Sequence, residues 1–172
     1  MHDAFEKLST AAGRDDNWEV MNFALGAEKT KQFINISANS HSSSILDILE
    51  THTSAEASAS YIGRQEIDIK TLDSIFSDIH KGEKEILLKI DTQGFELSVL
   101  SGAETALQYI NTIQLEMSLR PLYDGQPLYH QLMDFLHYHG YTLIDIEPGF
   151  ADLKTGTLLQ FDGVFRKAVI IN

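Results

Sequence analysis

The chain has 172 residues, of which 43% are hydrophobic and 22% charged, so we expect one globular domain over residues 1–172. Thirteen Lys and Arg against 25 Asp and Glu give a net charge of -12, which disfavours nonspecific binding to nucleic acid or to an anionic membrane. The absence of cysteine excludes disulfides and thiolate zinc sites. No apolar signal region opens the chain and no apolar run has the length of a membrane span, so we predict a cytoplasmic protein.

The first third of the chain predicts a helix and a hairpin. Residues 3–12 have a helical pattern that Gly13 ends. Residues 18–25 alternate loosely and predict a strand, and residues 32–38 predict its hairpin partner. Small and polar residues dominate 39–60, which is typical of a mobile loop carrying a short helix. This loop is either a lid over an acceptor pocket or a connector without a chemical role.

The middle of the chain is the most informative part. A strand at 64–69 and a helix starting near Thr71 precede a short apolar run at 86–90. After the polar turn 91–94, apolar residues recur with helical spacing as far as Leu107. This change of period predicts a buried strand that feeds a helix, as in a parallel βαβ unit. Because open parallel sheets bind ligands at the carboxyl ends of their strands, we expect the turn to lie at a functional site.

The last third of the chain predicts three strands, a loop and a helix. These are a strand at 112–118, a loop at 120–127, a helix at 128–139, and strands at 141–146 and 157–166. Asp162 and Gly163 interrupt the last strand and predict a bulge. His130 and His137 share a helical face but have no carboxylate beside them, so we expect no metal site.

Polar residues occupy one face of each of the two central strands. Lys89 and Asp91 share a face of the first, and Gln114, Glu116 and Ser118 share a face of the second. If the strands are neighbours, Lys89 can pair with Glu116. This ion pair either only neutralises charges on a half-buried strand or forms part of the lining of a cleft.

The string L-L-K-I-D-T-Q-G-F-E-L-S-V-L-S-G-A-E at 87–104 resembles the signature of the FkbM family of S-adenosylmethionine-dependent methyltransferases. Shorter similar segments are N-F-A-L-G at 22–26, S-S-S-I-L at 42–46, T-L-D-S-I at 71–75, I-Q-L-E at 113–116 and H-G-Y-T-L at 139–143. The resemblance extends from about Phe5 to Arg166. It implies an α/β fold with a class I methyltransferase-like (Rossmann-like) doubly wound sheet, mostly parallel, with a C-terminal antiparallel strand.

In this family the methyl donor binds a Gly-rich turn after strand one, and an acidic residue that ends strand two holds the ribose. Residues 1–8 resemble the helix that follows that acidic residue, so we expect an N-terminally truncated domain without strands one and two. Gly13 alone cannot replace a Gly-rich turn.

The resemblance implies an S-adenosylmethionine-dependent O-methyltransferase that acts on a hydroxyl of a sugar or natural product. We assign catalysis to Asp91, Lys89 and Glu116, cofactor binding to Asp91, Gln93 and Gly94, and acceptor binding to Ser43, Ser44, Glu96 and Glu116. Glu96 either binds the acceptor or only stabilises the start of its helix. The alternative function is a non-catalytic acceptor-binding or assembly module that has lost the methyl-donor site.

Loss of strand one has a further consequence for the strand at 86–91. It would become an apolar sheet edge, and such edges aggregate or recruit a partner. We therefore expect a second copy of the chain, another chain with the missing half, or the 18–38 hairpin to cover it.

Overall fold

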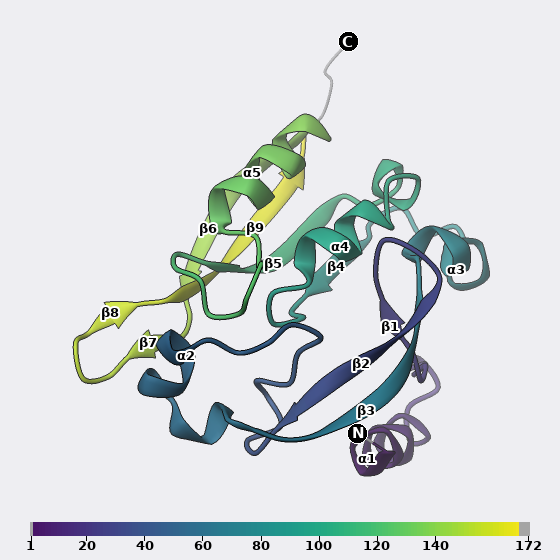
Figure 1. Ribbon diagram of the computed structural model, residues 1–172. Coiled ribbons are helices and arrows are strands. Elements are labelled where there is room, and N and C mark those ends of the chain that lie inside the picture. Colours follow the sequence, from purple (N-terminus) through teal and green to yellow (C-terminus); the bar gives the residue numbers. More distant parts are fainter. Residues whose placement is uncertain (1, 169–172) are drawn as a thin grey trace.

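The computed structural model describes residues 2–168, which form three separate sheets and five α-helices (Figure 1). The helices are α1 (His2–Ala12), α2 (Glu50–Ala55), α3 (Leu72–Ile79), α4 (Glu96–Ser101) and α5 (Tyr129–Tyr138), with short 3-10 helices η1 (Ala57–Ala59) and η2 (Ala106–Gln108). The strands are β1 (Ala24–Leu25), β2 (Thr30–Ser37), β3 (Tyr61–Lys70), β4 (Leu87–Ile90), β5 (Thr112–Ser118), β6 (Tyr141–Pro148), β7 (Ala151–Asp152), β8 (Thr157–Leu158) and β9 (Gln160–Lys167). No helix in this part of the chain is both long and apolar enough to cross a membrane.

The main sheet has the strand order β4-β5-β9-β6, and only β4 and β5 pair in parallel. The predicted strand-to-helix unit and the antiparallel last strand are confirmed, whereas the mostly parallel, doubly wound sheet is not found, because the described sheets are mixed. The inward side chains of β5 are fully buried, and they form one core with α4 and α5. This core includes Leu100, Ile113, Leu115, Met117, Leu132 and Leu136. The predicted apolar face of β5 is therefore confirmed.

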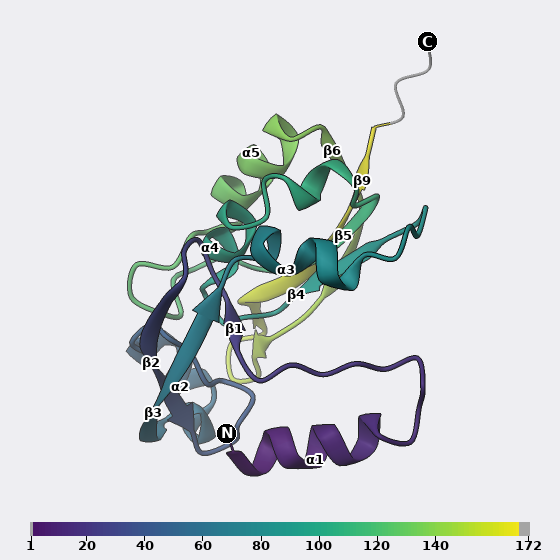
Figure 2. The same cartoon turned by 90° about the vertical axis from the view of Figure 1, so that its right-hand side faces the viewer.

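The second sheet has the order β1-β3-β2, and it lies below the main sheet in Figure 1. The predicted hairpin between 18–25 and 32–38 is wrong: β2 pairs antiparallel with β3, and β1 pairs in parallel with β3. The expected strand 18–25 shrinks to two residues because its first half has no strand beside it, and Trp18 is 45% exposed. Figure 2 shows the long irregular stretch between α1 and β1.

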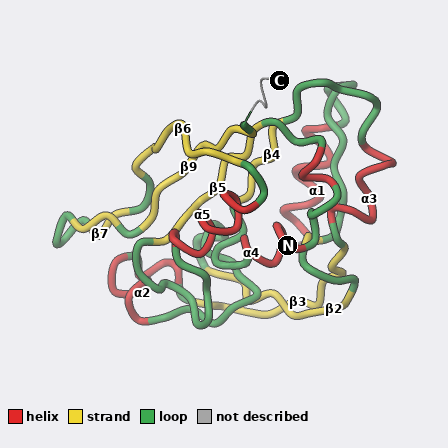
Figure 3. The backbone as a smooth tube through the Cα atoms, turned by 90° about the horizontal axis from the view of Figure 1, so that it is seen from above, coloured by secondary structure: helices red, strands yellow, loops and turns green. Residues whose placement is uncertain are grey.

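The predicted last strand, 157–166, is divided. Its first two residues form β8, which pairs with β7 in a hairpin that projects from the fold (Figure 3), and β9 begins at Gln160. The predicted bulge at Asp162 and Gly163 is also wrong, since the register shift lies in β6, between Leu143 and Asp145. Gly163 leaves room for two side chains instead, because a Cβ there would crowd the methyl group of Met117 and the ring of Phe165.

Candidate active site

The turn after β4 has an unusual backbone. Gln93 and Gly94 both have left-handed backbone angles, with φ of 55° and 99°. A Cβ at Gly94 would lie 3.0 Å from Leu46 Cδ1 and 3.1 Å from Gln126 Cβ, so glycine avoids tight contacts there as well as backbone strain. Gln93 has no such freedom, and its left-handed conformation is held by contacts from elsewhere in the fold.

Glu96 stabilises this turn from the first residue of α4. Its side chain is only 3% exposed, and Oε1 accepts hydrogen bonds from the backbone N–H groups of Thr92, at 3.1 Å, and Gly94, at 3.0 Å. The Thr92 hydroxyl adds a third bond at 3.1 Å. Burial raises the pKa of Glu96, while these bonds oppose the rise. Of the two roles predicted for Glu96, these contacts support the structural one.

Gln93 joins two carboxyl groups on neighbouring strands, that of Asp91 directly after β4 and that of Glu116 within β5. Its Nε2 donates to Asp91 Oδ1 at 3.0 Å and to Glu116 Oε2 at 2.8 Å. Its Oε1 accepts from the Tyr123 hydroxyl at 2.8 Å. Gln160 Nε2 gives Glu116 Oε2 a second hydrogen bond at 2.7 Å. The Gln93 amide therefore uses both N–H groups and its oxygen within the site.

Glu116 is a second carboxyl group of this site whose pKa is raised. Burial, followed by the charges of Asp91, Glu96 and Asp162, raises the pKa of Glu116 to about 8. The group is consequently protonated at neutral pH. It can donate a hydrogen bond there and becomes a base only in alkaline solution.

Lys89 does not pair with Glu116, which corrects the expected ion pair. Its Nζ lies 3.7 Å from Asp162 Oδ2, and its side chain is 52% exposed. The reason is the position of β9 beside β5, which places Asp162 directly opposite Glu116 in the register. Asp162 also accepts a hydrogen bond from Gln114 Nε2 at 2.8 Å. The two strand faces thus meet as predicted, but a third strand supplies the counter-charge.

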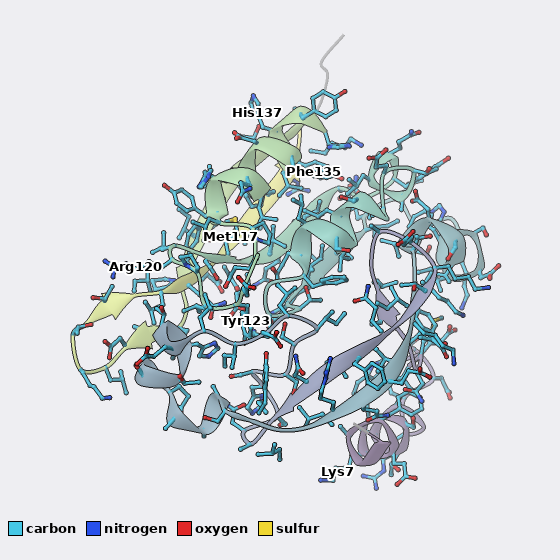
Figure 4. All side chains as sticks on the ribbon, in the orientation of Figure 1. Lys7, Met117, Arg120, Tyr123, Phe135 and His137 are labelled. Atoms are coloured by element: carbon cyan, nitrogen blue, oxygen red, sulfur yellow. The ribbon has the colours of Figure 1, made fainter. Side chains whose placement is uncertain are left out.

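The loop that follows β2 contains Ser42, Ser43 and Ser44, and it packs against the turn after β4. Ser44 Oγ donates to the Gln93 carbonyl at 2.7 Å, and the Tyr123 hydroxyl lies 3.2 Å from the Ser42 carbonyl. Tyr123 is fully buried and lies near the centre of the molecule (Figure 4). Ser43 lines a cavity beside the turn, and its hydroxyl accepts from the Ser37 backbone N–H. Ser44 and Tyr123 therefore hold Gln93 in its left-handed conformation.

A cavity of about 360 Å³ opens at the carboxyl end of β4. Its polar walls come from Ser43, Lys89, Asp91 and Thr92, and the remaining walls are mainly apolar. The volume is within the range of small-ligand sites. Of the described residues that line it, Asp91 has the only carboxylate and Lys89 the only ammonium group, so the cavity presents one negative and one positive group within mainly apolar walls.

Tyr123, Gln160 and Asp162 belong to the site but were not predicted. Gln160 and Asp162 alternate on one face of β9 and lie opposite Ser118 and Glu116. Their alternation indicates that both side chains lie on one face of β9. Which residues they contact, however, depends on the register between β5 and β9. Tyr123 lies in an irregular loop, where no repeating pattern of apolar residues indicates which side chains are buried.

The comparison with models of protein families shows to which family the chain belongs. The model of the methyltransferase FkbM domain matches residues 4–143, well over half of the chain. The chain belongs to the FkbM methyltransferase family. The matched region of this FkbM protein contains β4, the turn, α4 and Glu116, and hence most of the site. No curated protein and no solved structure matches the chain.

Proposed function

We propose that this FkbM methyltransferase transfers a methyl group from S-adenosylmethionine to a hydroxyl of a sugar or natural product, with Asp91 at the reacting oxygen. One observation supports this most strongly. Asp91 ends β4 and lines the cavity, while one of its two oxygens is held by Gln93. A carboxylate fixed in this way has a second oxygen available for chemistry.

The apolar cavity with its one carboxylate fits a sulfonium cofactor. When bound, S-adenosylmethionine supplies an electrophilic methyl group on a positively charged sulfur. Asp91 balances that charge and accepts, through Oδ2, the proton of the acceptor hydroxyl. The apolar side chains of Ile90 and Phe95 line the same cavity beside Asp91, which is itself exposed.

Lys89 has the acceptor-side role in this proposal, whereas Glu116 acts through Gln93. Glu116 does not line the cavity, and it accepts a hydrogen bond from the same Gln93 amide that holds Asp91. Lys89 lines the cavity with a half-exposed ammonium group, which binds an acceptor oxygen. Gln93 and Gly94 shape the turn that places Asp91. Ser43 completes the acceptor wall, and Ser44 orients Gln93.

The direct test is calorimetric titration of the full chain with S-adenosylmethionine and S-adenosylhomocysteine. We expect a Kd near micromolar, about -8 kcal/mol. Asp91→Asn should weaken S-adenosylmethionine binding by roughly 10- to 100-fold, the usual loss of a hydrogen-bonded charge. Glu147→Gln removes an exposed carboxylate on the outer strand β6 and should leave binding unchanged.

A second measurement tests the reaction. Tritium from S-[methyl-3H]adenosylmethionine should enter hydroxylated sugars or polyketides with the wild-type chain and not with Asp91→Asn. If the chain is well folded but binds neither S-adenosylmethionine nor S-adenosylhomocysteine, the proposed enzymatic function is refuted. Such a result would favour the non-catalytic acceptor-binding or assembly module.

A further inference from the structure

A buried histidine lies close to the turn, and the proposed reaction does not use it. His52 is part of α2, which lies beside the β7–β8 hairpin (Figure 1), and only 3% of the residue is exposed. Its Nδ1 has no hydrogen-bond partner among residues 2–168, and its Nε2 lies 3.5 Å from the hydroxyl oxygen of Ser42. Nearly all buried polar atoms in folded proteins have a partner, so the state of this ring needs an explanation.

The hydroxyl of Ser42 assigns the hydrogens of the ring. Ser42 Oγ already accepts a hydrogen bond from Asn39 Nδ2 at 3.0 Å, so its own hydrogen is available to His52 Nε2. Nε2 is then an acceptor, and the one ring N–H of the neutral imidazole is on Nδ1. A second proton on Nε2 would oppose the Ser42 hydroxyl and would bury a positive charge.

Neutral groups surround the ring. The aromatic rings of Tyr123 and Phe150 pack on it, and each ring centroid lies 5.2 Å from that of His52. Tyr123 belongs to the smaller hydrophobic core of the protein, and Phe150 packs against that core. No carboxylate of residues 2–168 forms an ion pair with His52, so a charged ring would have no direct partner there.

The charged groups further away do not replace such a partner. Glu56 favours the charged form of His52, but its Oε1 already accepts from the backbone N–H and the hydroxyl of Ser58. Burial lowers the pKa of His52, and this effect outweighs that of Glu56. The segments that pack together here carry further charged or titratable side chains, none of which shifts this pKa: His41, Asp47, Glu50, Tyr61, Arg120, Asp124, Glu147, Asp152 and Lys154.

His52 acts on the site through Tyr123. The Tyr123 hydroxyl donates to Gln93 Oε1 at 2.8 Å and lies 3.2 Å from the Ser42 carbonyl. Gln93 in turn donates to Asp91. His52 contacts both residues that fix this hydroxyl, because its ring meets the Tyr123 ring at 83° and its Nε2 faces the Ser42 side chain. Movement of His52 would therefore be passed to Gln93.

We propose that His52 is a positioning residue, which holds Ser42 and Tyr123 against Gln93 while its ring is neutral and releases them when the ring is protonated. Because the folded chain disfavours the charged ring, the closed arrangement is fully stable above the ordinary pKa of 6.5 and is lost as the pH falls below it. The release moves α2 away from the loop that contains Tyr123. Its effect on Asp91 rests on the proposed function, whereas the release itself does not.

Hydrogen exchange measures the release. The informative amides are those of Leu49, which donates to the Leu122 carbonyl, and Asp124, which donates to the Asp47 carbonyl, because both bonds join the α2 segment to that loop. Wild type is compared with His52→Phe, whose ring keeps the aromatic contacts and takes no proton. Between about pH 7.5 and 5.5, these amides of wild type should exchange faster relative to the variant, by up to about tenfold per pH unit, the limit for one proton. Amides in the β5–β9 ladder should show no such difference.

Two further variants make the result decisive. His137→Phe removes an exposed imidazole on α5 and should keep the pH dependence of wild type. If His52→Phe does not fold, His52→Gln replaces it, since a side-chain amide also accepts from Ser42 and does not titrate. Equal pH dependence in wild type and the His52 variant would overturn the proposal. So would a His52 ring that titrates at 6.5 or above in NMR spectra.

The link to Gln93 has two readouts of its own. At the lower pH, the side-chain amide hydrogens of Gln93 should exchange faster in wild type than in His52→Phe. The affinity for S-adenosylmethionine should also fall more steeply with pH in wild type. With Tyr123→Phe in both backgrounds these differences should disappear, because the bond to Gln93 is then absent.

Equal exchange at Gln93 in wild type and His52→Phe, or a difference that persists with Tyr123→Phe, would show that His52 does not position Gln93. A chain that binds no cofactor at either pH would refute the proposed function alone. The exchange at Gln93 is measured without cofactor, so the two failures can be told apart.

Discussion

Replacing Glu116 by Gln should remove a pH-dependent loss of stability. The pKa of Glu116 is about 8 in the folded chain against an ordinary value of 4.5. Because the folded state holds the proton more tightly, stability is greatest below 4.5 and falls as the pH rises towards 8. A difference from 4.5 to about 8, at about 1.36 kcal/mol per unit, gives a loss of at most roughly 5 kcal/mol. Glutamine keeps the shape of the neutral acid and still accepts from Gln93 and Gln160.

The assay is urea unfolding of wild type and Glu116→Gln at a series of pH values from about 5 to 9. The difference between the two curves isolates Glu116, and the variant should become the more stable protein as the pH rises. Glu147→Gln controls for the loss of an exposed carboxylate and should follow the wild type. If the curves for wild type and Glu116→Gln run parallel over this range, Glu116 is not a buried neutral acid and the reasoning fails.

Three further substitutions test the parts of the site separately. Gly94→Ala should lower the free energy of unfolding by about 2–4 kcal/mol in thermal unfolding, because backbone strain and crowding act together. Gly125→Ala should lower it less, since Gly125 has φ of 70° but no atom lies near its Cβ. Equal losses in the two variants would show that crowding at Gly94 has no effect. Tyr123→Phe should cost about 1–2 kcal/mol in urea unfolding, because it leaves Gln93 Oε1 without its donor, and no loss would show that this bond is not formed. Lys89→Gln should change stability by less than about 1 kcal/mol, and less at high salt, since its ion pair is half exposed; a larger effect would indicate a buried charge.

The strand, turn and helix around Asp91 could be predicted because their signals are local. Apolar spacing changes within a few residues from Ile86–Ile90 to the helical pattern after Gly94, and glycine marks the turn between them. The faces of β5 were predictable for the same reason, since alternation along one strand needs no knowledge of its neighbours. Ile113 and Leu115 are fully buried, whereas Glu116 is in the polar network.

Pairing between distant segments could not be predicted in the same way. The hairpin prediction for 18–38 rested on closeness in sequence, but β2 formed a longer ladder with β3. The Lys89–Glu116 pair followed from two adjacent strands considered alone. β9 then placed Asp162 beside Lys89 and Gln160 beside Glu116, from more than 40 residues further along the chain. Patterns along the chain define faces, while the register that joins them depends on the assembled sheet.

The side chain at position 93 shows how this assembly sets the charge of the site. A glutamate there could not donate to Asp91 or Glu116, and would place a second negative charge beside that of Asp91. The amide of Gln93 instead gives one N–H to each carboxylate and receives the Tyr123 hydroxyl on its oxygen. Gln160 is a second neutral donor to Glu116. Within residues 2–168 no cation offsets the burial of Glu116, so it keeps its proton at neutral pH, and Asp91 is the one carboxylate among the described residues that line the cavity.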